Sequence, residues 1–247
     1  MVVALHLAII LPGCDAQGNE SEIISQPAQP TKTARIMPLG DSITVLSRGS
    51  TYRSYLWQLA FGKGYRIDLV GSQQDIFKGK PSTDFDIDHE GHPGWRADQV
   101  LAQIREWAIA AQPDFVLIHL GHNDLCQGQD IASTVGDLAV IIDRLRTVNP
   151  RVGIVLAQVI ASSSSCHSQI PAFNAELPAL AASKTSAYSP VIVVDQYTDF
   201  FPATMTTDGV HPNAIGNSQI AERWFATLTP LLNIGITAKP ASANARV

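Results

Sequence analysis

The stretch RIMPLGDSIT, at residues 35–44, begins like a buried strand and ends like a tight turn. Residues 36–39 are apolar, and Gly40, Asp41 and Ser42 follow without a break. A turn of small and polar residues after a strand can expose a serine hydroxyl at the edge of a sheet. Such residues are also common in ordinary turns, so the role of Ser42 depends on what the rest of the chain brings to the same edge.

Further short apolar runs recur along the chain, and most are rich in Val, Ile and Leu without strict alternation. This pattern is typical of parallel strands that are buried on both faces. The predicted strands are 35–39, 67–70, 115–120, 153–160 and 191–194. With the helical patterns between them, they predict an α/β fold, a single flavodoxin-like three-layer domain with a five-stranded parallel sheet over residues 34–232.

Longer segments with apolar residues at steps of three and four separate these strands. Such stripes cover residues 100–111, 131–145 and 220–228, and each predicts a helix with one face on the sheet. We expect Pro230 to end the last helix, because proline lacks a backbone N–H and clashes with the preceding turn. Residues 233–247 show no periodicity, so we expect a loose C-terminal tail.

The composition is that of a folded domain. Of the 247 residues, 45% are hydrophobic and 16% are charged, which excludes wholesale disorder. The net charge is −5 and Lys and Arg do not cluster, so we expect no nucleic-acid partner. No Cys or His spacing predicts a metal site, and the alternating Asp84, Asp86 and Asp88 lack the glycine and distal glutamate of a calcium loop. We therefore expect neither a metal nor another cofactor.

The first 14 residues form an apolar stretch that ends at Cys14. They resemble a bacterial lipoprotein signal, in which the cysteine after the cleavage site carries lipid. A plain secretory signal is the alternative, because the stretch lacks Lys and Arg and has Pro12 close to the cysteine. Either version predicts an extracytoplasmic protein, with membrane attachment only through lipid on Cys14. The polar residues 15–33 then form a flexible tether.

Three further motifs carry side chains of chemical interest. Asn123 follows the third predicted strand, and Gly94 lies in a loop with the sequence HEGHPGW. Asp208 stands three residues before His211, a spacing that lets a carboxylate hold an imidazole in one tautomer. Ligand sites in open α/β sheets form at the carboxyl ends of strands, so we expect these groups to meet Ser42 there.

The four motifs, in this order, resemble those of the SGNH (GDSL-type) hydrolases from about residue 35 to residue 232. Within that superfamily, RIMPLGDSIT, YRSYL at 52–56 and HEGHPGW at 89–95 look like carbohydrate esterase family 3, whose members include acetyl xylan esterases.

The resemblance implies a role for each of five residues. Ser42 is the implied nucleophile, His211 the general base and Asp208 the acid that orients it. The N–H groups of Ser42 and Gly94 and the side-chain amide of Asn123 form the implied oxyanion hole. This set suits acyl transfer, because a serine hydroxyl needs a base to take its proton and the developing oxyanion needs fixed donors.

The implied function is a serine esterase that removes small acyl groups, above all acetyl, from carbohydrate. An acylated carbohydrate is then the expected partner. Two alternatives stay open, namely a non-catalytic carbohydrate-binding surface protein on the same fold and an esterase or lipase of other acyl substrates.

Other residues near these motifs have less defined roles. His89 and His92 flank the Gly94 loop, and loop histidines are most often solvated. Trp95 fits a sugar platform as well as packing over the sheet edge. His122 stands where the resembling family commonly has Thr, which predicts an altered pocket wall without displacement of Asn123.

We also expect a disulfide between Cys126 and Cys166. The two cysteines lie in the loops after the third and fourth predicted strands. These strands are neighbours in a flavodoxin-like order, so both loops leave the same edge side by side. With Cys14 carrying lipid or removed, the two remaining thiols would be in an oxidising compartment. Two unrelated thiols are the alternative.

Overall fold

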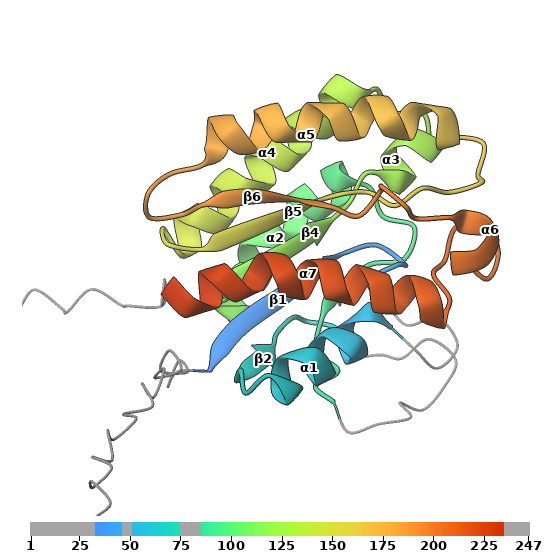
Figure 1. Cartoon of the computed structure of the whole chain (residues 1–247). Coiled ribbons are helices and arrows are strands. Elements are labelled where there is room, and N and C mark those ends of the chain that lie inside the picture. The colour runs from blue at the N-terminus through green and yellow to red at the C-terminus, as the bar shows by residue number, and fades with distance from the viewer. Residues whose placement is uncertain (1–32, 46–50, 75–84, 235–247) are drawn as a thin grey trace, which may run out of the picture.

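A computed structural model describes residues 33–45, 51–74 and 85–234 (Figure 1). A parallel sheet forms the middle layer, and helices cover both of its faces. The predicted signal at 1–14, Cys14, and all of the predicted tether except residue 33 lie outside the described residues. Within the described ranges, no helix is long and apolar enough to cross a membrane.

The sheet confirms the predicted flavodoxin-like order. Its main path is β2-β1-β4-β5-β6, and every pair is parallel. Its strands are β1 (Ala34–Gly40), β2 (Ile67–Leu69), β4 (Phe115–His119), β5 (Gly153–Gln158) and β6 (Val191–Asp195). The strand order reverses between β1 and β4, which is where such sheets bind ligands.

A sixth strand, β3 (Glu90–Gly91), was not predicted. It pairs with the end of β1, with Leu39 opposite Glu90 and Gly40 opposite Gly91. Two residues carry no periodic signal, so sequence patterns cannot reveal such a strand. Its position is important, because it joins the HEGHPGW loop to the strand that precedes Ser42.

Two core layers lie on opposite faces of the sheet. One face packs against α2 (Ala97–Ala111), α4 (Ile131–Val148) and α5 (Ile170–Lys184), and the other against α1 (Tyr52–Gly62) and α7 (Ala214–Ile234). Successive residues of one strand alternate between the layers. In β4, for example, Val116 and Ile118 face α2 and α4, whereas Phe115 and Leu117 face the other layer. Both faces are apolar, which explains the continuous hydrophobic runs.

Short helices complete the fold at the carboxyl edge of the sheet. They are α3 (His122–Cys126), the 3-10 turn His167–Gln169 and α6 (Pro202–Met205). The long helix α4 begins where the side chain of Asp130 accepts a hydrogen bond from Ser133 N at 2.8 Å. Such an N-cap satisfies a backbone donor that the first turn would leave unpaired.

The expected end of the last helix at Pro230 is wrong, because α7 continues through Pro230 to Ile234. A proline inside a helix loses one backbone hydrogen bond, but Leu231 and Leu232 beyond it are buried against the second core layer. Burial of two leucine side chains, worth about 1.5–3 kcal/mol each, offsets that loss. Residues 233 and 234 thus belong to α7 and not to the expected loose tail, and residues 235–247 lie outside the described part of the chain.

Candidate active site

Ser42 lies in a turn that the end of β1 makes possible. Asp41 closes this turn, because its Oδ1 accepts a hydrogen bond from Ile43 N at 2.8 Å and its carbonyl accepts one from Thr44 N at 3.1 Å. Gly40 has to be glycine, since a Cβ there would lie 2.2 Å from Thr44 Oγ1 and 2.9 Å from the carbonyl oxygen of His119. The turn leaves Ser42 partly exposed at the sheet edge.

The structure brings Ser42, His211 and Asp208 into one hydrogen-bonded line. His211 Nε2 lies 2.9 Å from Ser42 Oγ, and His211 Nδ1 lies 2.8 Å from Asp208 Oδ2. Asp208 Oδ1 accepts hydrogen bonds from the backbone N–H groups of His211 and Val210. Partial burial raises the pKa of Asp208, but these backbone bonds and the contact with the His211 ring outweigh it and hold the pKa at about 2. Asp208 is therefore a carboxylate at neutral pH.

A serine-rich loop supports the turn that carries Asp208 and His211. Gly209, with φ +87°, forms the tip of this turn, and its carbonyl accepts a hydrogen bond from Ser163 N at 2.8 Å. Thr206 Oγ1 accepts a hydrogen bond from Gly209 N at 2.7 Å. Sequence reasoning missed Ser163, because a run of serines shows no periodicity that would place it beside the histidine.

Gly94 lies in a four-residue turn with the sequence His-Pro-Gly-Trp. Trp95 N donates to His92 O at 3.1 Å, and Gly94 has φ +79°. Pro at the second position and Gly at the third are what a type II turn requires. Within the described ranges, neither Ser42 N nor Gly94 N donates to another group.

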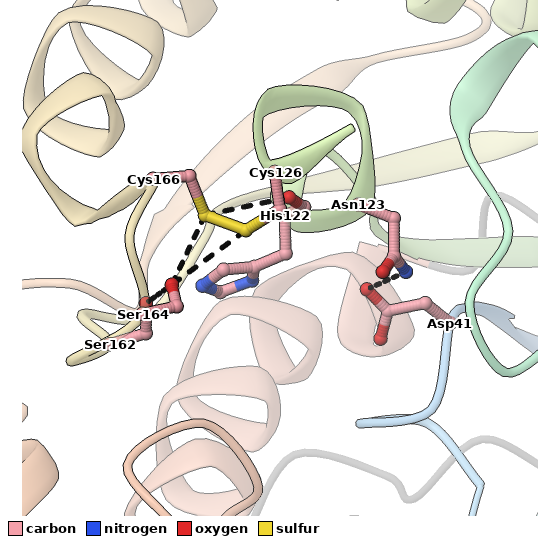
Figure 2. The surroundings of a disulfide bond; sticks show 7 residues. All are labelled: Asp41, His122, Asn123, Cys126, Ser162, Ser164 and Cys166. Carbon is pink, nitrogen blue, oxygen red and sulfur yellow. Dashed lines mark hydrogen bonds between the residues drawn. A yellow bond between two sulfur atoms is a disulfide. The ribbon is translucent and has the colours of Figure 1, made fainter. Parts of the chain in front are cut away.

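The amide of Asn123 connects the Ser42 turn to the Gly94 turn. Asn123 Nδ2 donates to Asp41 Oδ2 at 3.3 Å and to Trp95 O at 3.1 Å, and Figure 2 shows the contact with Asp41. Gln127, at the end of α3, donates to Gly94 O at 2.8 Å. Asn123 is therefore hydrogen-bonded to Asp41 and Trp95, the chain neighbours of Ser42 and Gly94 in the implied oxyanion hole.

Two buried carboxylates support this network, and the sequence did not single them out. Burial raises the pKa of Asp41 to about 6, although the hydrogen bond from Ile43 N and the nearby His211 oppose this shift. Burial likewise raises the pKa of Asp124 to about 6, against the hydrogen bond that Asp124 accepts from Ala97 N. The second carboxylate caps the first turn of α2, directly after the Gly94 loop.

The expectation that His89 and His92 are solvated is wrong. His89 is completely buried, and its Nδ1 accepts a hydrogen bond from Gly91 N at 3.0 Å. The side chain of His92 is 12% exposed and packs against Trp95. The pairing of β3 with β1 draws this loop into the fold, which sequence patterns did not indicate. Trp95 also packs against the first core layer.

His122 is buried, and its side chain points toward Ser162 and Ser164, whereas that of Asn123 points toward Asp41 (Figure 2). Burial lowers the pKa of His122 to about 4, so its ring is neutral at physiological pH. Its neighbour His119, at the end of β4, is buried as well, and burial lowers its pKa to about 3.

A disulfide joins Cys126, at the end of α3, to Cys166, in the loop after β5 (Figure 2). The two Cα atoms are 4.9 Å apart, within the range that disulfides adopt. The bond ties the helix that carries Asn123 to the loop that carries Ser163. One covalent link thus connects the helix of Asn123 to the loop that supports the turn of Asp208 and His211.

Across the described ranges, no cluster of three or more His, Cys, Asp or Glu side chains could hold a metal ion. Asp86 and Asp88, from the alternating acidic run, lie in a local network in which Asp86 accepts hydrogen bonds from Leu69 N and Asp88 N. Asp84 lies outside the described residues.

This fold and the comparisons with known proteins define an α/β domain of the SGNH hydrolase class. The chain belongs to the GDSL-like lipase/acylhydrolase family, whose family model matches residues 39–219.

Curated relatives include esterases. The chain is 28% identical over 219 residues to a multidomain esterase of Ruminococcus flavefaciens, a match that covers 78% of this chain and 28% of that protein. It is 25% identical over 170 residues to thioesterase 1/protease 1/lysophospholipase L1 of Escherichia coli (strain K12), which covers 69% of this chain and 80% of that protein. The chain therefore spans less than a third of the multidomain relative.

Similar solved structures include carbohydrate esterases. A carbohydrate esterase family 3 protein from Talaromyces cellulolyticus is 31% identical with a TM-score of 0.75, over 82% of this chain and 99% of that one. A family 3 carbohydrate esterase of Clostridium thermocellum is 32% identical with a TM-score of 0.72, over 82% of this chain and 98% of that one.

Proposed function

We propose that the protein is a serine esterase that removes acetyl groups from carbohydrate. The observation that carries this proposal is the line from Ser42 Oγ through the His211 ring to Asp208, with contacts of 2.9 Å and 2.8 Å. The likeness to two carbohydrate esterases of family 3 supports carbohydrate as the substrate class.

In the first half of the proposed reaction, His211 Nε2 takes the proton of Ser42 as its Oγ attacks the ester carbonyl. Asp208 holds the ring by its Nδ1–H and stabilises the imidazolium that forms. The tetrahedral intermediate then collapses, the carbon–oxygen bond to the sugar breaks, and His211 returns its proton to the leaving sugar oxygen. In the second half, water attacks the acyl-serine by the same route and releases acetate.

The oxyanion is bound by the N–H groups of Ser42 and Gly94 and by the Asn123 amide. Each such donor typically contributes about 3–4 kcal/mol to transition-state stabilisation. Asn123 Nδ2 has two hydrogens, and both are used in the free enzyme. We expect the longer contact, 3.3 Å to Asp41, to be exchanged for the oxyanion as charge develops.

Hydrolysis of p-nitrophenyl acetate by the wild type and by Ser42→Ala tests the reaction. We expect the variant to lose activity and keep its thermal stability, because removal of one partly exposed hydroxyl changes little packing. Turnover above about a tenth of wild type would exclude Ser42 as the nucleophile.

Acyl preference tests the substrate class. We expect p-nitrophenyl acetate to be hydrolysed with higher kcat/KM than the butyrate and octanoate esters. Acetate release from acetylated xylan and acetylated glucomannan then identifies the polymer. Higher efficiency on octanoate, with no acetate released from either polymer, would contradict a carbohydrate acetylesterase.

We also propose that the enzyme acts outside the cytoplasm, as the signal-like residues 1–14 suggest. Expression of the full chain in a bacterium, followed by fractionation, tests the location. A Cys14→Ala variant separates lipid attachment from plain secretion, because only a lipidated protein would leave the membrane fraction on this change.

A further inference from the structure

A partly buried side-chain cluster packs against the Gly94 turn. It consists of His92, Glu90, Trp95 and Trp107, and none of these residues contributes a proposed oxyanion donor. The His92 ring contacts both tryptophans, with centroid distances of 4.6 Å to Trp95 and 4.4 Å to Trp107. His92 and Trp95 are the first and last residues of the turn, and their stacked rings join its two ends.

Glu90 fixes the orientation of the His92 ring. Its carboxylate is fully buried and accepts three hydrogen bonds, from Ser72 N at 2.8 Å, Ser72 Oγ at 2.7 Å and His92 Nε2 at 2.7 Å. A buried carboxylate is tolerated only with such donors, so each of them is strongly held. The contact also places a hydrogen on Nε2 of His92.

The backbone of the same segment is attached to the strand that leads to Ser42. Glu90 and Gly91 pair with β1, and His92 N donates to Gly40 O at 2.9 Å. The turn is thus anchored by its backbone to β1 and by the His92 side chain to Glu90 and α2.

The direction of Gly94 N–H depends on the peptide between Pro93 and Gly94. Type I and type II turns differ by a flip of this middle peptide, so the turn type decides where its N–H points. We propose that His92 is a positioning residue, which holds the turn so that Gly94 N–H faces the oxyanion. This inference rests on the proposed esterase function.

A double-mutant cycle with p-nitrophenyl acetate tests the inference. His92→Phe keeps an aromatic ring but removes the donor to Glu90, and Gly94→Ala disfavours the positive φ that the turn needs. We expect His92→Phe to lower kcat roughly tenfold to hundredfold with KM within twofold of wild type, because a misplaced donor weakens transition-state binding alone. In the Gly94→Ala background, His92→Phe should lower kcat by less than a further twofold.

Ser189→Ala is the matched control for loss of a buried hydrogen bond. Ser189 donates to Val152 O at 2.6 Å before β6, at the opposite end of the strands from Ser42. We expect this variant to lose thermal stability like His92→Phe but to keep its kcat. Glu90→Gln removes an acceptor with little change in volume, and it replaces His92→Phe in the cycle if that variant fails to fold.

Two results would overturn the inference. One is a kcat within twofold of wild type in folded His92→Phe, and the other is an equal loss of kcat with and without Gly94→Ala. Ser42→Ala keeps the two proposals apart. If it retains activity, the esterase mechanism fails, whereas an inactive Ser42→Ala with an additive cycle refutes only the role of His92.

Discussion

Removal of the disulfide between Cys126 and Cys166 should destabilise the fold by an amount that depends on the length of the loop the bond closes. We expect the double variant Cys126→Ser/Cys166→Ala to lose about 4 kcal/mol of unfolding free energy, because the bond closes a loop of 40 residues in the unfolded chain. Serine suits the exposed Cys126, and alanine suits Cys166, which is 3% exposed.

Urea titration at 25 °C and thermal unfolding measure this loss. For a domain of this size the melting temperature should fall by roughly 8–16 °C, at about 2–4 °C per kcal/mol. Activity at 25 °C should fall less than stability, because Ser163, Gln127 and Asn123 keep their non-covalent contacts to the site.

Peptide mapping after alkylation without reduction is the control for this experiment. It should recover Cys126 and Cys166 in one linked peptide from the wild type. The chain-entropy argument would be refuted if the wild type gives the linked peptide but melts less than about 3 °C above the double variant. Two separately alkylated cysteines would show that the bond does not form.

Three further changes test the site. Asp208→Asn should lower kcat by roughly 10³–10⁴-fold at unchanged folding, because the amide no longer holds the base in its working tautomer; p-nitrophenyl acetate kinetics measure this. Burial raises the pKa of Asp41 from 3.8 to about 6, so between these pH values the folded state holds a proton that the unfolded state has lost. Ionisation of Asp41 should therefore lower the unfolding free energy by about 3 kcal/mol as pH rises from about 4 to about 6. Asp41→Asn should remove that part of the slope in urea titrations at pH 4–7, and an unchanged slope would contradict the burial argument. Gly40→Ala should cost about 1–3 kcal/mol and reduce kcat, because the new Cβ meets Thr44 and the backbone of His119; a wild-type melting curve would refute this.

The sheet could be predicted because its central strands, β1, β4 and β5, are buried on both faces. Strands β4 and β5 are runs of mostly apolar residues, and the helices α2, α4 and α7 show stripes of 3.6-residue period. The two-residue strand Glu90–Gly91 gave no such signal. Helix α7 continues past Pro230, because burial of the leucines that follow offsets a cost of proline that the local sequence alone shows.

The candidate site was predictable where local sequence dictates local geometry. Asp208 and His211 are three residues apart and share one turn, and Gly94 sits in a Pro-Gly turn. The supporting contacts were not predictable, because they join segments far apart in the chain. Ser163 reaches Gly209 across 46 residues, and Asn123 reaches Asp41 across 82. Such pairings follow from the strand order, and only three-dimensional packing sets their distances.

The contact between Ser42 and His211 joins residues that are 169 positions apart. Loop closure over that distance is among the most entropically costly steps in assembling this domain, so it should come late during folding. Neither the first half of the chain nor a collapsed intermediate without docked α7 can turn over an ester by this route. The rate at which activity returns during refolding therefore reports the final docking of the C-terminal segment. The far-ultraviolet circular dichroism reports the formation of the earlier helices.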